Sequence, residues 1–446
     1  MRALLWLSTG LFLTVLTVGS YRYGRVREQA EQALPPVTVE DTHFVKNHQP
    51  FWVHGVNYYP QRTPWSLFWP QYDPEVIAQD LQKIRGLGFN TVRIFLPHAY
   101  FRGPFDQPDS QRYLKQLKHF LATAEAQGLY CVLTLFDFYQ DYQNPEGARQ
   151  DLERLVPALR SSSAILAWDV KNELDRDVAN VPVAPEVLQQ WLDQVIPTLQ
   201  RLDPDHLVTL GWSRPEAMLR WRTTVDYDTF HDYERPEVLG PRLDFVSSQR
   251  RLRGIRRPWV MGELGYHTWP EAQPDPHFVE HQFNYLNAVL ATRLVKDLDG
   301  QMVWNLYDYH PSLREPWVLQ GASVQYYMGL LTVEGQAKSG LQALQSAVFV
   351  RDALTRGEPT LESRQLEAVF WAANTGEALL KSETGQLLHQ WPVQKGLNQL
   401  RWEVTPAEIQ ALIYLKTRYL LRLPEVWNLA HDRVPAQDHA LTLRLR

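Results

Sequence analysis

Short apolar runs alternate with longer helical patterns along the middle of the chain. The runs are rich in β-branched and aromatic residues, and the segments between them repeat apolar residues every three to four positions. This alternation predicts parallel βα units. Eight strands are predicted, over residues 52–57, 91–96, 130–136, 165–170, 206–210, 224–230, 259–261 and 300–305.

Helix-start signals fall between these runs. Asp73-Pro74-Glu75 places a capping residue before a proline at the first helical position, and Pro185-Glu186 precedes another apolar face. Residues 277–298 and 339–356 are predicted to form the last two helices. Because no Gly-rich phosphate loop follows any strand, a closed (β/α)8 barrel over residues 48–356 is favoured over a doubly wound sheet.

The pattern changes after about residue 356. Short strand candidates follow one another with few helical stretches, and turn signals such as Asn374-Thr375-Gly376 separate them. A small β-sandwich-like domain over residues 357–446 is therefore predicted. Such a domain either binds glycan or packs on the barrel as a structural appendage, and the appendage is favoured because a fold does not set a function.

A membrane signal precedes the barrel. Residues 3–21 carry no charge, and as a helix they would span about 28 Å, close to the roughly 30 Å hydrocarbon core of a bilayer. Residues 1–27 are therefore predicted to be a signal-anchor or a signal peptide. The length favours the uncleaved anchor, because cleaved apolar regions are on the order of 7–15 residues. Residues 28–47, with Pro35-Pro36, are predicted to be a stalk or linker.

Aromatic residues are abundant, with 16 Trp, 20 Tyr and 17 Phe. Large barrels bury many of them, but an excess of Trp also suits a cleft that stacks on sugar rings. A net charge of −5 excludes the electrostatic footprint of a nucleic-acid-binding protein. The single cysteine, Cys131, excludes an intrachain disulfide and a cysteine-cluster metal site, and no H-E-x-x-H spacing occurs. We expect no metal and no cofactor.

Two glutamates follow predicted strands directly. Glu173 comes after the fourth strand, and Glu263 comes after the seventh. In barrels of this type the chemistry sits at the C-terminal strand ends, where burial and a neighbouring like charge push two carboxyl pKa values apart. Hydrolysis of a glycosidic bond needs such a pair, one neutral acid and one ionised carboxylate. One such glutamate alone is usually a solvated loop charge, but two at these strand ends favour a catalytic site.

Over about residues 51–330 the sequence resembles the retaining (β/α)8-barrel glycoside hydrolases that carry catalytic glutamates on strands four and seven. Within that clan it is most similar to family 5, the cellulase/mannanase-like enzymes. The resemblance rests on separate motifs in chain order: HGVNYYP at 54–60, NTVRIF at 90–95, Asn172-Glu173, Phe230-His231-Asp232-Tyr233, MGELG at 261–265 and MVWNLYDY at 302–309.

The resemblance implies a catalytic role for both glutamates. Glu263 would be the nucleophile and Glu173 the acid and then the base, in a double displacement through a covalent glycosyl-enzyme. Asn172 would hydrogen-bond the sugar 2-hydroxyl. A transglycosidase that remodels a surface or exported polysaccharide, and a catalytically silent glycan-binding barrel, are the alternatives to hydrolysis of β-glycosidic bonds.

Four more residues match positions with supporting roles in that family. Arg93 would hold the carboxylate network, and Tyr233 would hydrogen-bond the nucleophile. His231 would lie near the acid/base, and Trp304 would form the floor of the subsite for the attacked sugar.

The third strand departs from the family pattern. The family usually has a histidine near its end, whereas residues 135–139 read Leu-Phe-Asp-Phe-Tyr, so Asp137 or Tyr139 would fill that space. The loop after the first strand carries Trp65 and Trp69, and loops after strands face the cleft. We therefore predict that these two indoles stack on sugar.

The location of the body depends on the N-terminal segment. That segment is followed by three arginines, Arg22, Arg25 and Arg27. By the positive-inside rule they favour a cytoplasmic location for the folded domains that come after them. A polymer-cleaving domain favours the opposite side. We expect an extracytoplasmic monomer that binds carbohydrate, held to the membrane by the N-terminal helix, or secreted if that helix is cleaved.

Overall fold

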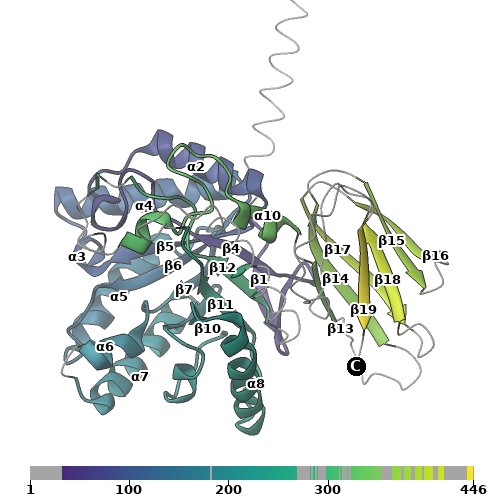
Figure 1. The fold of residues 1–446 in the computed structure, drawn as a ribbon. Coiled ribbons are helices and arrows are strands. Elements are labelled where there is room, and N and C mark those ends of the chain that lie inside the picture. Colours follow the sequence, from purple (N-terminus) through teal and green to yellow (C-terminus); the bar gives the residue numbers. More distant parts are fainter. Residues whose placement is uncertain are drawn as a thin grey trace, which may run out of the picture.

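The structure is a computed structural model, drawn in Figure 1. It describes residues 33–180, 183–268, 298–310 and 323–346, together with single residues between 282 and 319. Beyond residue 346 it describes the backbone of the strands between residues 348 and 444. The predicted membrane segment and most of the predicted helix at 277–298 lie outside the described residues.

Nine parallel strand segments form the central sheet, in the order β8-β7-β6-β5-β4-β12-β11-β10-β9. The two ends of this order, β8 and β9, are consecutive pieces of one stretch, so the sheet closes into a barrel. All eight predicted strands are confirmed, the fifth one being split in two. In chain order they are β4 (Val53–Asn57), β5 (Thr91–Pro97), β6 (Tyr130–Asp137), β7 (Ile165–Asp169), β8 (Leu207–Thr209), β9 (Gly211–Trp212), β10 (Asp228–His231), β11 (Trp259–Leu264) and β12 (Gly300–Val303).

Helices surround this barrel (Figure 1). The predicted cap of α2 is confirmed, because the Asp73 side chain accepts hydrogen bonds from the backbone of Glu75 and Val76. The long helices are α2 (Pro74–Leu87), α4 (Pro108–Ala126), α5 (Pro145–Leu159), α7 (Pro185–Leu202) and α8 (Pro236–Leu252). Shorter ones are η1 (Trp65–Leu67), α3 (His98–Phe101), α6 (Leu174–Asn180), η2 (Ala217–Leu219), η4 (Ser323–Tyr327) and α10 (Ser339–Ser346).

The last predicted helix, over residues 339–356, is wrong in its second half. Helix α10 ends at Ser346, and residues 348–352 form strand β13 (Val348–Asp352). The β-branched and aromatic run Val348-Phe349-Val350 favours an extended backbone. Strand β13 pairs antiparallel with β14 over its whole length, and this pairing overrides the helical pattern.

A small antiparallel sheet of three strands covers the N-terminal end of the barrel. It consists of β1 (Val37–Glu40), β2 (His43–Lys46) and β3 (Gln49–Pro50). Val37 and Phe44 are buried in one apolar cluster with Val53, Tyr130 and other residues of the barrel strands. The predicted linker over residues 28–47 is therefore wrong in its second half, since its apolar residues have barrel surface to bury.

Seven antiparallel strands follow the barrel. Three of them form one sheet and four form another, in the orders β13-β14-β17 and β16-β15-β18-β19. Their bounds are β14 (Arg364–Ala372), β15 (Gly376–Ser382), β16 (Leu387–Val393), β17 (Gly396–Val404), β18 (Gln410–Leu415) and β19 (His439–Arg444). The predicted division at residue 357 and the sandwich-like packing stay predictions.

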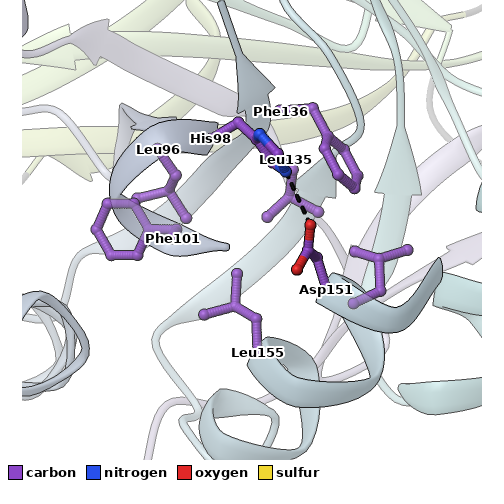
Figure 2. A pocket seen from close by; sticks show the side chains of 8 residues that line it. Leu96, His98, Phe101, Leu135, Phe136, Asp151 and Leu155 are labelled. Carbon is purple, nitrogen blue, oxygen red and sulfur yellow. Dashed lines mark hydrogen bonds and ion pairs between the residues drawn. The ribbon is translucent and has the colours of Figure 1, made fainter. Parts of the chain in front are cut away.

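One small cavity lies outside the barrel wall, between α3, β6 and α5 (Figure 2). Its volume is about 20 Å³, enough for one water molecule and far too small for a sugar. His98 and Asp151 form its polar side, with Nε2 of the histidine 2.8 Å from Oδ2 of the carboxylate. This cavity is therefore not the substrate site.

Among the residues that the structure describes, no helix is long and apolar enough to cross a membrane.

Candidate active site

Arg93 lies fully buried in β5 and donates hydrogen bonds to four side chains at the barrel mouth. Nε and Nη2 contact Oδ2 of Asp169 at 3.0 and 2.8 Å. Nη1 contacts Oε1 of Glu263 at 2.6 Å and Oδ1 of Asn57 at 3.0 Å, while Nη2 also contacts Oδ1 of Asn172 at 2.9 Å. One guanidinium therefore joins strands β4, β5, β7 and β11, as the resemblance implied.

The charges of this network compensate one another. Burial lowers the pKa of Arg93, but the carboxylates of Asp169 and Glu263 outweigh burial and raise it. Asp169 is also held by the Thr134 hydroxyl at 2.8 Å and by the backbone N–H of Gly211 at 2.9 Å. A buried ion pair with its remaining hydrogen bonds satisfied is rigid, so the mouth is organised before any ligand arrives.

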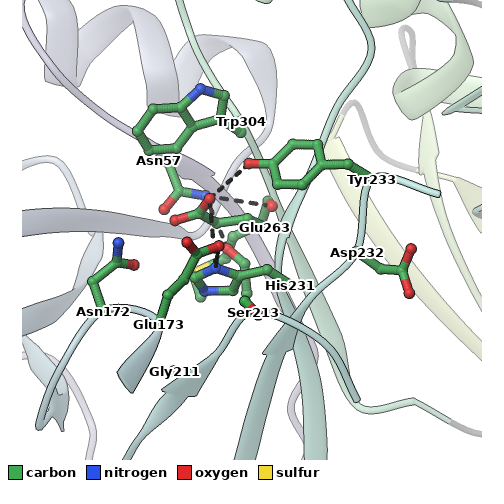
Figure 3. A network of polar contacts seen from close by, with 12 residues as sticks. Asn57, Asn172, Glu173, Gly211, Ser213, His231, Asp232, Tyr233, Glu263 and Trp304 are labelled. Carbon is green, nitrogen blue, oxygen red and sulfur yellow. Dashed lines mark hydrogen bonds and ion pairs between the residues drawn. The ribbon is translucent and has the colours of Figure 1, made fainter. Parts of the chain in front are cut away.

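Glu263 stands in β11 between two donors. Besides Arg93, the Tyr233 hydroxyl donates to Oε2 at 2.6 Å (Figure 3). Burial and the charge of Glu263 both raise the pKa of Tyr233, so the phenol keeps the proton that it donates. The preceding residue must be glycine, because a Cβ on Gly262 would lie 2.3 Å from the side chain of Thr229. The nucleophile position predicted from sequence is thus oriented through both carboxylate oxygens.

Glu173 follows β7 and faces His231 of β10. Nδ1 of His231 lies 3.0 Å from Oε1 of Glu173 and 3.6 Å from Oε2 of Glu263. The other oxygen of Glu173 accepts a hydrogen bond from Arg176 at 3.0 Å. One oxygen of each glutamate and a ring nitrogen of His231 all lie within 4.8 Å of one another. The structure therefore brings the two predicted carboxylates together, with the predicted histidine between them.

The pKa of Glu173 depends on opposing effects. Burial raises it, but the hydrogen bond and charge of His231, together with the guanidinium of Arg176, outweigh burial and lower it to about 2. Because the Arg176 side chain is 63% exposed, water screens its contribution more than that of His231. Glu173 is therefore ionised in this arrangement.

Among the residues that the structure describes, one group has a geometry suited to a metal ion. It consists of Glu173, His231 and Glu263. Arg93 and Arg176 already donate to the two carboxylates, and Tyr233 donates to one of them as well. These donors compensate the negative charge that a cation would compensate. The contacts therefore favour an acid/base pair over a metal centre.

Trp304 lies at the end of β12, in the position that the resemblance implied. Its indole is nearly buried, and its N–H donates to Oε1 of Gln325 at 3.1 Å. The Trp304–Asn305 peptide bond is cis. Trp65 packs beside it with ring centroids 6.1 Å apart and also lies 5.1 Å from Tyr309. With only 5% of Trp65 exposed, it supports the Trp304 wall and leaves little surface for a sugar.

Trp69 does not have its predicted role. Its indole is fully buried, stacks on Phe68 at 4.5 Å and contacts Phe101 edge-on at 4.9 Å. The indole N–H donates to the backbone carbonyl of Phe95 at 2.9 Å. The prediction that Trp69 stacks on sugar is wrong, because the loop after β4 folds back and this side chain joins the core.

Asp137 and Tyr139, the two alternatives at the end of the third strand, point to different sides. Tyr139 stacks on Trp191 of α7 at 5.6 Å, and its hydroxyl donates to the backbone carbonyl of Asp141 at 2.5 Å. The pKa of Asp137, by contrast, responds to the charges of Lys171, Arg93 and Glu263. Asp137 therefore fills the space at the mouth.

Strained backbone gathers around the site. Trp65, Phe136, Phe138 and Glu173 all have φ between 47° and 59°, the left-handed region that side chains of this size rarely adopt. Such residues persist only where surrounding contacts hold them, and they cluster at functional sites. Phe136 is the next-to-last residue of β6, and the other three positions follow β4, β6 and β7, so this strain lies at the mouth.

Two residues of the network were missed from sequence, Asp169 and Asn57. Each is the last residue of its strand, β4 or β7, where a charged or amide side chain that closes an apolar run is itself a signal. Asn57 donates from Nδ2 to the carbonyl of Gly262 at 2.9 Å while accepting from Arg93. A search for glutamates that follow a strand passes over these two residues, because they are the last residues of the strands themselves.

Comparison with known proteins points to the same family as the sequence motifs. Residues 46–239 match the family model Cellulase (glycosyl hydrolase family 5). Over these residues the chain is similar to the family 5 glycoside hydrolases.

The curated proteins similar to this chain include two kinds of enzyme, and one example of each follows. One is the probable mannan endo-1,4-beta-mannosidase C of Aspergillus terreus, 36% identical over an alignment of 170 residues that covers 31% of this chain and 40% of that protein. Another is the beta-glucuronidase of Chlorocebus aethiops, 23% identical over 288 residues, covering 61% of this chain and 41% of that protein. The chain thus spans about two fifths of the length of these relatives.

Solved structures share the fold. An exo-beta-1,4-mannosidase from Opitutaceae bacterium strain TAV5 superposes with a TM-score of 0.56 and 21% identity, covering 66% of this chain and 58% of that one. At this identity the likeness concerns the barrel fold, and the chemistry of the family 5-type barrel has to be argued from its own residues.

Proposed function

We propose that the chain is a retaining β-glycoside hydrolase with Glu263 as nucleophile and Glu173 as acid/base. The observation that carries the proposal is the close approach of the two carboxylates, with an oxygen of each within 4.8 Å. Retaining enzymes hold their carboxyl groups about 5–5.5 Å apart, whereas inverting enzymes leave roughly 6.5–9.5 Å for a water. The spacing favours direct attack by a carboxylate.

In the first step an oxygen of Glu263 attacks the anomeric carbon while Glu173 gives its proton to the departing glycosidic oxygen. Arg93 and Tyr233 hold the attacking carboxylate in position. Glu173 must first take up a proton, because its neighbours lower its pKa in the empty site. A bound sugar displaces water and the exposed Arg176, and both changes raise the pKa of Glu173. Glu263 remains beside it as a like charge, which also raises that pKa.

In the second step Glu173, now ionised, takes a proton from water as that water attacks the anomeric carbon and releases Glu263. His231 lies between the two glutamates and keeps their oxygens apart in fixed positions. Asn172, anchored by Arg93 through its Oδ1, leaves its amide N–H₂ to bond the sugar 2-hydroxyl. The relatives are named as β-mannosidases and β-glucuronidases, which supports a β-glycoside as substrate.

Trapping the covalent intermediate tests this function. Incubation with an activated 2-fluoro β-glycoside should add one glycosyl mass to the protein, and peptide mapping should find it on Glu263. Glu173→Gln should turn over dinitrophenyl glycosides, whose leaving group needs no proton, much faster than glycosides with poor leaving groups. An adduct on another residue, or equal loss on both substrates, would contradict the assignment.

We also propose that this barrel works outside the cytoplasm, close to a membrane. Support comes from the uncharged stretch of residues 3–21 and from the polymeric substrates of the mannanase-type relative. Protease added to intact cells should degrade the barrel, whereas a cytoplasmic barrel would be cut only after lysis.

A further inference from the structure

The third barrel strand changes its facing pattern at its end. In a strand, alternate residues face the same side, and Thr134 of β6 faces the interior, where its hydroxyl contacts Asp169. The next interior position would be Phe136. Its φ of 48° interrupts the alternation, and its ring packs outward on Trp191 of α7 at 5.4 Å. This break leaves Asp137 to face the mouth.

Asp137 is 95% buried, since only 5% of it is exposed. Its Oδ2 has no hydrogen-bond partner among the residues that the structure describes. A buried carboxylate oxygen without a donor is costly, and such a group usually awaits a water or a ligand. The strained Phe136 that directs Asp137 inward is a second sign that this placement serves a function.

The surroundings of Asp137 are those of the reacting sugar. It is near enough to Lys171, Arg93 and Glu263 for their charges to act on it, and it acts in turn on Tyr59. The Tyr59 ring in turn contacts Trp304 edge-on at 6.3 Å. The charge of Lys171 is shared, because its Nζ lies 3.2 Å from Oδ2 of Asp177.

We propose that Asp137 accepts a hydroxyl hydrogen bond from the sugar attacked by Glu263 and thereby selects neutral sugars over uronic acids. This inference rests on the proposed function and narrows its substrate class. A hydroxyl supplies the donor that Oδ2 lacks. A sugar carboxylate at the same place would meet Asp137 and Glu263 as like charges, and it would leave Oδ2 without a donor.

The inference discriminates between the two groups of curated relatives. One group is named for mannan and the other for glucuronides. The Asp137 carboxylate can accept a hydrogen bond from a neutral mannoside, whereas it repels the carboxylate of a glucuronide. We therefore expect a β-mannoside or another neutral β-glycoside to be the better substrate of this barrel.

The first experiment compares Asp137→Asn with the full-length wild-type protein on three aryl β-glycosides, a mannoside, a glucoside and a glucuronide. Asn keeps the shape but removes the charge, so kcat/KM on the better neutral substrate should fall about tenfold and that on the glucuronide should rise about tenfold. Asp151→Asn is the matched control, since it removes a partly buried carboxylate at the cavity of Figure 2, away from the mouth.

Deoxy substrates test the hydroxyl contact itself. Removal of the contacted hydroxyl should lower kcat/KM of the wild type about tenfold and should cost Asp137→Asn much less, because the bond is already weakened. Two results together would overturn the inference. One is a ratio of kcat/KM on the neutral substrate to kcat/KM on the glucuronide that stays within twofold of the wild type in Asp137→Asn. The other is the lack of any hydroxyl whose removal costs the wild type more than the variant.

A pH series on the wild type needs no variant, so a folding defect in Asp137→Asn does not remove the test. Burial raises the pKa of Asp137 to about 6, against the charges of Lys171 and Arg93 and together with that of Glu263. The side chain is neutral below that pH and anionic above it. The neutral-to-uronide ratio should therefore rise through about pH 6, because ionisations common to both substrates cancel in the ratio. A flat ratio would contradict the inference.

The two proposals fail in different ways. If the wild type forms the 2-fluoro adduct but Asp137→Asn leaves selectivity unchanged, hydrolysis stands and the role of Asp137 falls. If no β-glycoside is turned over or trapped, hydrolysis falls. NMR titration of the wild type and Asp137→Asn with mannose, glucose and glucuronic acid then still measures selectivity.

Discussion

The two ends of the barrel are built from the same strands and differ in almost every physical property. At the N-terminal end Phe44 packs edge-on against Tyr227 at 5.0 Å, and Phe51 packs against Tyr130 at 5.3 Å, all within an apolar cluster. At the mouth the buried Arg93 binds two carboxylates and two amides. The N-terminal end is filled mainly by packed rings, with ion pairs such as His43–Asp299 beside them, whereas the mouth is organised around one buried guanidinium.

The contacts that stabilise the fold therefore lie mainly at one end of the barrel, and the groups of the candidate site lie at the other. Burial of apolar surface stabilises the fold without demanding exact atom positions, so the covering sheet β1–β3 resists unfolding. Buried charges are costly unless each is paired, so the mouth is held by directional contacts and strained residues such as Glu173. Substitutions at the two ends should therefore affect different measurements.

Glu263→Ala should have the largest effect, at the mouth. Without the nucleophile, kcat/KM should fall on the order of 10⁴-fold or more, because no other carboxylate reaches the anomeric carbon from that side. Steady-state kinetics on an aryl β-glycoside measure the loss, and circular dichroism should show the wild-type spectrum. Residual activity within a hundredfold of the wild type would assign the nucleophile elsewhere.

Phe44→Ala should have the largest effect at the other end. Emptying the site of a fully buried phenyl ring should lower the free energy of unfolding by about 3–5 kcal/mol. Urea denaturation measures this change, while kcat/KM in the absence of denaturant should stay within about twofold of the wild type, since the ring contacts none of the catalytic groups. A large loss of activity in the folded variant would show that the two ends are coupled.

Arg93→Lys should reduce activity on the order of 10²-fold while keeping the positive charge. A single ammonium cannot bridge Asp169, Glu263, Asn57 and Asn172 in the fork geometry of a guanidinium. The loss should appear mainly in kcat, because Glu263 is misplaced for attack. Near-wild-type kcat would mean that charge alone, and not geometry, is required at this position.

Arg176→Ala should have the smallest effect, at the exposed rim of the mouth. Arg176 helps to lower the pKa of Glu173, so its removal raises that pKa. A general acid works only while protonated, and the alkaline limb of the kcat/KM profile should move to higher pH by less than about one unit. An opposite shift would mean that Glu173 is not the group that titrates in that limb.

Much of the barrel and its central pair was predictable from sequence. Apolar runs of strand length located all eight strands, and the glutamates near the ends of two of them are the pair that the structure brings together. The failures share one cause. A period-two or helical pattern indicates on which side of its own strand or helix a residue lies. It does not indicate which loop folds back onto the core or which end of the barrel is covered by another sheet.

Trp69 and Phe44 show that limit. Both belong to segments without strong periodicity, and both are fully buried because a distant strand offers them apolar surface. Asp137 shows it again, since only the break at Phe136 turned it, rather than its neighbour, toward the mouth. Local patterns do not encode such exceptions, because contacts from other elements hold them in place.

The sequence alone determined that a parallel barrel forms and that Glu173 and Glu263 stand at the ends of its strands, because strand patterning and strand order are local properties. Only the tertiary structure decided what surrounds them. Arg93 and Glu263 are 170 positions apart along the chain, and closure of the sheet brings them to 2.6 Å. A hydrogen-bond network is a property of distances in space, so the contacts that bring Glu173 and Glu263 together exist only once the barrel has closed.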